Sequence, residues 1–296
     1  MDSVAAKRPP VIAAIAAHWP IAVGLLALIV PTLIVLARDN WTTEAGVQGP
    51  IILATGIWLF YSQKEVIAQY RRPGSLLIAI PAGVFAALCY MLGQALGFLV
   101  IQVGATILMC EVIFYLFMGW EVCKRLWFAL LYMYFVAPLP GWFQDRLTGS
   151  LKEWVSASVT DLLSGAGIPV VREGVVMYVA QYQLLVEDAC SGLNSLTSLF
   201  AIGLFYVYIL HQASVRYALF LAALILPIAI FANIIRVIIL VLLTYYGSDE
   251  IAQGFLHEFA GMVTFITALV TIMLIDSALQ PIFARRAKGS LDARPA

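Results

Sequence analysis

Charged side chains are scarce in this sequence. Lys, Arg, Asp and Glu make up 11% of the 296 residues, whereas about 25% is usual for a soluble domain. Apolar residues make up 62%, so the few charges could not cover the surface of a water-soluble fold. The 17 basic and 17 acidic residues balance, which argues against the positive field of a nucleic-acid-binding protein. The composition therefore predicts an integral membrane protein with no nucleic-acid partner.

Cysteine and histidine are rare as well. The chain has four Cys, without a C-x-x-C pair, and three His. This pattern argues against a disulfide framework and against a structural zinc site. We therefore expect no metal and no cofactor, and the position of each single Cys or His becomes the informative feature.

Long apolar runs are abundant. A bilayer core of about 30 Å requires roughly 20 apolar residues in a helix. Eight runs approach this length: 19–37, 48–62, 75–95, 98–118, 126–140, 192–210, 217–246 and 259–279. The second and fifth are short, and the seventh is long enough to leave the membrane or to bend near Pro227. We predict an all-α integral membrane protein, with about eight transmembrane helices in a single membrane domain over residues 1–296.

Lys and Arg are distributed unevenly between the two sides of these spans. If the N-terminus is inside, twelve of the sixteen cations outside the spans fall on the inner side. This is a strong positive-inside bias, so both termini are predicted to be cytoplasmic. Four cations fall on the outer side: Arg38, Arg146, Lys152 and Arg172.

The largest segment between spans, residues 141–190, is predicted to be extracytoplasmic. Apolar residues recur at a helical period over 142–164, which predicts a short amphipathic helix that could lie along the membrane surface. Gly165, Gly167 and Pro169 then end the helix. Residues 175–186 are rich in Val, Tyr and Gln and predict a possible β-hairpin that turns near residues 180–181.

Cys190 lies where this extended segment ends and the sixth span begins. A thiolate at a helix N-terminus is stabilised by free backbone N–H groups and by the helix dipole, which lowers the pKa of the thiol. The neighbours Ser191 and Gly192 are small and would let a substrate backbone approach. Cys190 is therefore a candidate nucleophile, and the alternative is an ordinary buried cysteine.

Arg236 interrupts the apolar seventh span. A charged residue in such a run is costly and suggests a function. Asn233 lies three residues earlier on the same helical face. The alternatives are a structural ion pair, or a side chain that reaches to the outer headgroups.

His257 precedes the eighth span at the predicted outer boundary, whereas His18 and His211 fall on the inner side. An imidazole titrates near neutral pH, so His257 could act as a general acid or base. The adjacent Glu258 could orient the imidazole or serve as the base itself. The alternative is an ordinary histidine in an interfacial loop.

The three candidates share one predicted side of the membrane. A thiolate, a base and a cation are the parts of a cysteine acyl-transfer site, in which the cation could stabilise the oxyanion. The other cysteines, Cys89, Cys110 and Cys123, fall within spans or at the inner side.

These motifs resemble those of the exosortase/archaeosortase family of membrane cysteine transpeptidases. The similar pieces, in chain order, are Val171-Arg172-Glu173-Gly174-Val175, Ala189-Cys190-Ser191-Gly192-Leu193, Asn233-Ile234-Ile235-Arg236-Val237 and His257-Glu258-Phe259-Ala260-Gly261. The resemblance implies a nucleophile at Cys190, an oxyanion or thiolate partner at Arg236, and an acid–base residue at His257. Asn233, Ser191 and Glu258 would support them.

The resemblance also implies substrates and a location. The substrates would be exported proteins with a C-terminal signal, made of a short Pro-Glu-Pro-like (PEP-CTERM-like) motif, a transmembrane helix and a basic tail. The enzyme would be a multi-pass protein of the bacterial inner membrane, surrounded by membrane lipids. Its active site would face the periplasm.

Two other functions stay open at this point. A small-molecule transporter could use Glu111, Arg236 and Asp276 along a polar path. The chain shows no repeat and no pair of matching interrupted helices, which many transporters have. A membrane acyltransferase could use Cys190 on lipid substrates, and only the transporter could work without this thiol.

Overall fold

The computed structural model describes residues 19–43, 46, 49–174, 176–179, 182–185, 196–210, 215–247 and 266–279. The chain forms two compact units. Unit 1 comprises residues 1–42 and 55–138, and unit 2 comprises residues 43–54 and 139–296. We describe each unit by itself.

Helices formed wherever the sequence carries a long apolar run. Four described helices are long and apolar enough to cross a membrane: Trp19–Asn40, Leu76–Leu96, Leu99–Met118 and Leu219–Tyr246. Four shorter apolar helices are Gly49–Ser62, Trp127–Val136, Phe200–Ile209 and Ile266–Leu279. The prediction of a helical membrane protein is confirmed. The eight helices coincide with the eight predicted runs, and the count of eight crossings stays a prediction.

Unit 1 is built only of helices in its described part. They are α2 (Trp19–Val35), the π-helical turn η1 (Leu36–Asn40), the second part of α3 (Gly49–Ser62), α4 (Lys64–Tyr70), α5 (Leu76–Leu96), α6 (Leu99–Met118), α7 (Trp120–Arg125), α8 (Trp127–Met133) and the 3-10 turn η2 (Tyr134–Val136). The predicted fifth span ends early, at Val136, because Pro138 and Pro140 follow it.

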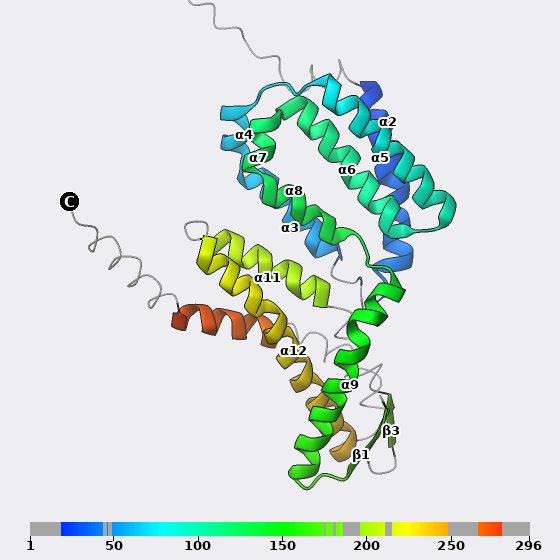
Figure 1. Cartoon of the computed structure of the whole chain (residues 1–296), viewed down its shortest axis with the longest axis vertical. Helices are drawn as coiled ribbons and strands as arrows, with labels where there is room; N and C mark the ends of the chain where they lie inside the picture. Colours follow the sequence, from blue (N-terminus) through cyan, green and yellow to red (C-terminus); the bar gives the residue numbers. More distant parts are fainter. Residues whose placement is uncertain are drawn as a thin grey trace, which may run out of the picture. The chain divides into compact units, whose positions relative to one another are not determined.

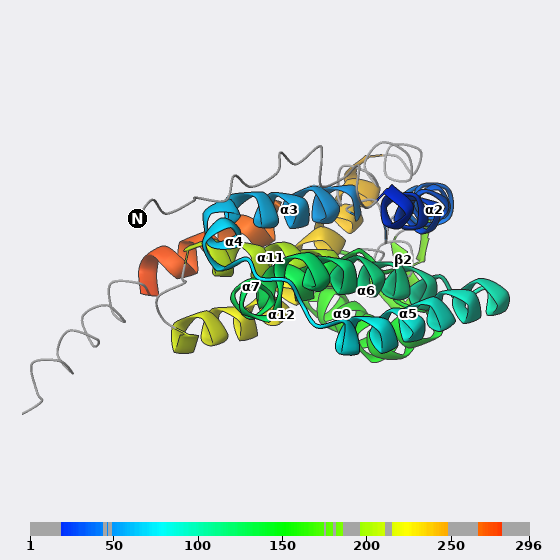
Figure 2. The same ribbon diagram turned by 90° about the horizontal axis from the view of Figure 1, so that it is seen from above.

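α5 and α6 form a hairpin in unit 1, and α6 also contacts α2 (Figures 1 and 2). Gly97 ends α5 with a φ of 69°, a conformation that glycine adopts without steric cost. A Cβ on Gly93 would lie 2.6 Å from the backbone nitrogen of Gln102, so the two helices touch backbone to backbone near the turn. In addition, the Oγ1 atoms of Thr32 and Thr106 form a buried hydrogen bond of 3.1 Å between α2 and α6.

Gly119 makes the corner between α6 and α7. Its φ of 84° and ψ of 174° lie in a region that essentially only glycine adopts. A Cβ on Gly119 would clash with the carbonyl oxygen of Arg72. The Arg72 N–H also donates to the Met118 carbonyl oxygen at 3.0 Å, so the segment after α4 presses against the end of α6.

Replacing Gly119 with alanine is expected to destabilise the protein strongly. The strained backbone and the clash with Arg72 together should cost roughly 3 kcal/mol or more. The measurement is the thermal unfolding midpoint of the purified protein in detergent. Gly104→Ala in α6 is the matched control, because nothing lies within 4 Å of a Cβ there, and it should leave the midpoint nearly unchanged. Equal midpoints for the two variants would contradict the conclusion that the turn between α6 and α7 requires glycine at position 119.

Unit 2 begins with α9 (Gly141–Gly165), followed by an antiparallel sheet in the order β1-β2-β3. The strands are β1 (Val170–Glu173), β2 (Val176–Val179) and β3 (Tyr182–Leu185). The predicted amphipathic helix and the hairpin over 175–186 are therefore confirmed. β1 was not predicted, and it pairs Val170 with Val179 across a turn at Gly174, whose φ is 62°.

The remaining elements of unit 2 are α11 (Leu196–Leu210), α12 (Val215–Tyr246) and the helix Ile266–Leu279. Two apolar clusters lie at different levels of α12. The first half of α12 packs on α11 and on the helix Ile266–Leu279, through buried residues such as Val207, Leu221 and Ile272.

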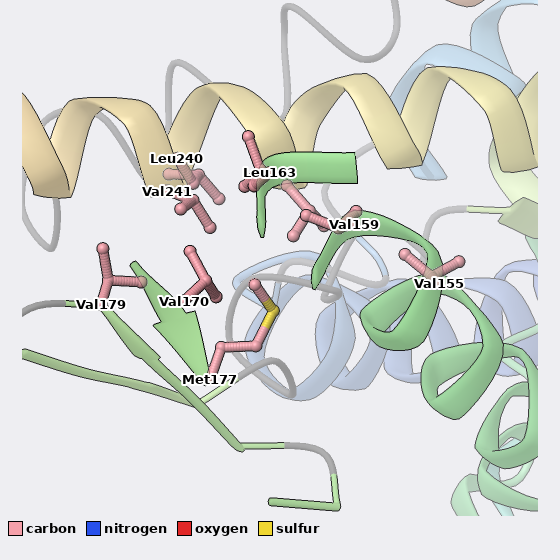
Figure 3. Packing of buried hydrophobic residues seen from close by; sticks show 9 residues of the cluster. Val155, Val159, Leu163, Val170, Met177, Val179, Leu240 and Val241 are labelled. Atoms are coloured by element: carbon pink, nitrogen blue, oxygen red, sulfur yellow. The ribbon is translucent and has the colours of Figure 1, made fainter. Parts of the chain in front are cut away.

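The second half of α12 packs on α9 and the sheet, as Figure 3 shows. Among the described residues, the buried members of this cluster are Val155, Val159, Leu163, Val170, Met177, Val179, Val237, Leu240 and Val241. Met177 and Val179 alternate with the exposed Tyr178 along β2, so one face of the sheet is apolar and covers α12. The predicted extracytoplasmic segment is thus packed on the end of a predicted span.

Candidate active site

Arg236 and Asn233 lie on α12 where its two apolar clusters meet. Ala232 belongs to the first cluster and Val237 to the second. The side chain of Asn233 is 0% exposed and that of Arg236 is 3% exposed. Their spacing of three residues puts them on one face of the helix, as the sequence predicted. A guanidinium is therefore enclosed by protein rather than reaching to headgroups.

The position of Arg236 along α12 gives its approximate depth. α12 has 32 residues and is about 48 Å long, whereas the hydrocarbon core is about 30 Å thick. The apolar span within α12 begins at Leu219, and Arg236 lies about 26 Å further along the helix. If Leu219 lies at one edge of the core, Arg236 lies just inside the opposite boundary.

The chain on either side of the Cys190 segment leads to this part of α12. β3 ends at Leu185 and pairs with β2, whose Met177 and Val179 pack in the cluster with Val237. On the other side, α11 begins at Leu196 and runs antiparallel to α12, with Gly203 against Ile225. Because the two helices run in opposite directions, seven residues back from Gly203 on α11 correspond to seven residues forward from Ile225 on α12. The start of α11 at Leu196 therefore lies near the level of Ala232.

Four of the six predicted site residues lie outside the described residues. They are Cys190, Ser191, His257 and Glu258. The structure brings Asn233 and Arg236 together and does not test the roles of the other four. In the part of the chain that the structure describes, no three His, Cys, Asp or Glu side chains gather as metal ligands.

The cysteines Cys89, Cys110 and Cys123 are free and half-buried on helices of unit 1. Cys123 lies on the short helix α7, outside the long apolar helices. Burial, and to a smaller degree the charge of Glu111, raises the pKa of its thiol above the usual value. Cys123 is therefore mostly a neutral thiol near pH 7 and a poor nucleophile.

Lys152 is a buried cation near the candidate site that the sequence analysis did not select. It is 8% exposed on α9, one turn before Val155 of the cluster, and Ser156 beside it is 0% exposed. Arg172 of β1 donates from Nη1 to the Ser156 Oγ at 3.4 Å and to the Gly174 oxygen at 3.1 Å. The signal was the position of Lys152 on the apolar stripe of an amphipathic helix.

Of the residues considered for a transporter path, Asp276 and Arg236 lie at different levels of unit 2. Asp276 accepts a hydrogen bond of 2.9 Å from the Tyr206 hydroxyl. By the contact of Gly203 with Ile225, Tyr206 lies near the level of Ala222, roughly 20 Å along α12 from Arg236. Glu111 belongs to unit 1 and accepts a hydrogen bond of 3.1 Å from the Tyr134 hydroxyl.

Comparison with known proteins identifies the family of this chain. The family model of the transmembrane exosortases matches residues 40–274. The chain belongs to the transmembrane exosortase family. Neither a curated protein nor a solved structure matches it.

The exosortase match includes both units and every predicted site residue. It covers α9, the three strands, α11 and α12, as well as the segments that carry Cys190 and His257. All six candidate site residues of this exosortase therefore lie within the part of the chain that matches the family. The match identifies the family and does not assign a role to any single residue.

Proposed function

We propose that this exosortase is a membrane cysteine transpeptidase that cleaves a C-terminal sorting signal from exported proteins. The family match over residues 40–274 carries the proposal. The buried Arg236 supports it, because an enclosed guanidinium on a membrane helix suggests a function.

The proposed chemistry begins at Cys190. Its thiolate attacks the carbonyl carbon of the scissile peptide bond, and the resulting oxyanion is stabilised by the Arg236 guanidinium. His257 donates a proton to the leaving nitrogen as the C–N bond breaks. The product is a thioester between Cys190 and the exported protein, and the signal helix leaves with a free amine. A second nucleophile, an amine or water, then attacks the thioester and restores the thiol.

Three further residues have supporting roles in this proposal. Asn233 lies one turn from Arg236, is fully buried, and would orient the guanidinium. Ser191 is small and would leave room for the substrate backbone beside the nucleophile. Glu258 would hold the imidazole of His257 in the productive orientation.

The proposed location is a bacterial inner membrane. The proposal includes eight crossings with both termini in the cytoplasm; the four long and four shorter apolar helices and the distribution of Lys and Arg support it. Residues 141–190 and the site then face the periplasm. The substrate's PEP-CTERM-like signal helix would enter from the surrounding lipid and place its motif at this face.

One experiment tests both the chemistry and the orientation. Spheroplasts that co-express this chain with a signal-bearing substrate are quenched in acid, and peptides containing Cys190 are searched by mass for the acylated form. We expect the adduct in untreated spheroplasts and its loss after treatment with a membrane-impermeant maleimide. His257→Ala should accumulate less adduct near neutral pH. An adduct on another residue, or one unaffected by the maleimide, would contradict the proposal.

The same mass measurement separates the rival functions. A lipid acyltransferase would carry a fatty acyl group on Cys190 instead of a peptide. A transporter would carry no acyl group at all.

A further inference from the structure

Unit 1 carries a compact group of cations on α4, on the loop after it and on α7. The group consists of Lys64, Arg71, Arg72, Lys124 and Arg125, all exposed, with Glu65 and Glu121 as the acidic residues of the same elements. α4 and α7 are in contact with each other. We call this surface the α4–α7 basic face.

The basic face is part of the tertiary structure and not a flexible tail. Backbone hydrogen bonds from Arg72 to Met118 at 3.0 Å and from Gly74 to Leu116 at 2.9 Å fix the loop on the end of α6. The Nε of Arg71 donates to the Phe117 oxygen at 3.3 Å. The Arg125 guanidinium lies 3.7 Å from the centre of the Tyr70 ring, so it stacks between α7 and α4.

The surroundings of this face match a membrane headgroup layer. The face lies where α5 begins and α6 ends, and both helices are long and apolar enough to span. The first residues of α5, such as Leu76 and Leu77, are 60% and 87% exposed, which suits contact with lipid chains. The exposed aromatics Tyr61 and Trp120 lie beside Lys64 and Lys124, and such residues are enriched at membrane interfaces.

We propose that the α4–α7 basic face binds the phosphate groups of anionic phospholipids. The cations are held at the depth where lipid phosphates lie. Arg71 and Arg72 offer guanidinium forks that match phosphate oxygens in two parallel hydrogen bonds. Lys64 and Lys124 add point charges at the rim, each near an exposed ring, at 5.0 Å from Tyr61 and 5.7 Å from Trp120. A fixed group of this kind should prefer a phospholipid with net negative charge over a zwitterionic one.

The test uses the full-length protein in nanodiscs of phosphatidylcholine that contain a small fraction of a dansyl-labelled lipid. Energy transfer from tryptophan reports how strongly labelled phosphatidylglycerol or labelled phosphatidylcholine gathers at the protein. We expect preference for phosphatidylglycerol in the wild type, and about tenfold or more weaker binding in Lys64→Gln/Lys124→Gln. Both side chains are exposed and contact Tyr61, Trp120 and Glu121 at the surface, so the variant should fold. Arg71→Gln/Arg72→Gln provides a second variant with the same expectation.

The matched control removes two exposed cations elsewhere, in Arg38→Gln/Arg146→Gln. Its preference for phosphatidylglycerol should equal that of the wild type. Inorganic phosphate should not displace the lipid at millimolar concentration. Equal binding of the two lipids by the wild type, an equal loss in the control variant, or displacement by inorganic phosphate would each overturn the proposal.

Discussion

Replacing Cys190 with alanine is expected to abolish processing of a co-expressed, signal-bearing substrate. The proposed reaction passes through a thioester, and alanine has no atom that can form it. Cys190→Ser should also lose activity by about a thousandfold or more, because a hydroxyl is far less ionised than a thiol at neutral pH. Immunoblotting of the cleaved substrate in isolated membranes measures both variants.

The other cysteines supply the matched controls. Cys89→Ser, Cys110→Ser and Cys123→Ser should keep most of the activity. Cys123 in particular is half-buried on α7, and its raised thiol pKa leaves little thiolate near neutral pH. An active Cys190→Ala enzyme would rule out covalent cysteine catalysis at this position. A loss confined to Cys123→Ser would move the nucleophile to unit 1.

Arg236→Lys is expected to insert normally and to process substrate about a hundredfold more slowly or worse, the cost of losing one preorganised oxyanion donor. Lysine keeps the charge and removes the planar fork that can give two parallel hydrogen bonds. Because the Arg236 side chain is 3% exposed, water cannot replace the missing donor. The measurement is the initial rate of substrate cleavage, normalised to the amount of inserted protein.

Arg146→Lys on α9 is a control of the same chemistry at an exposed position. It should keep nearly full activity, since Arg146 belongs to none of the site motifs. Full turnover in Arg236→Lys would reduce Arg236 to a counter-charge. Failure of Arg236→Lys to accumulate, with Arg146→Lys unaffected, would point to a structural role for Arg236.

Much of the secondary structure was predictable because its signals are local. An apolar run of about 20 residues forms a helix in a membrane, since every backbone polar group must find a partner within the segment. The amphipathic period over 142–164 predicted α9, and Gly165 ended it as expected. The hairpin of β2 and β3 followed from Val and Tyr on either side of a turn. Asn233 and Arg236 were found because polar residues in an apolar run need no partner to be noticed.

The features that were missed depend on partners distant in sequence. Val170–Glu173 has no alternating pattern and becomes β1 only because its backbone pairs with β2. Lys152 lies on the apolar stripe of a helix that was expected at the membrane surface, and only the packing of α9 shows that it is buried. The same holds for Gly119, because nothing near residue 119 in the sequence reveals that Arg72 lies against it. Tertiary contact, rather than local preference, decides these cases.

The cluster around Met177 imposes an order on biosynthesis. Val155, Val159 and Leu163 of α9 and Val179 of β2 leave the ribosome well before their partners Val237, Leu240 and Val241 of α12. The interval from β2 to Val237 is roughly sixty residues, or about 3–12 s at ordinary translation speeds. During that time the apolar sides of α9 and the sheet lack their final cover. The segments that form α11 and α12 must therefore be synthesised before the part that precedes them can finish folding.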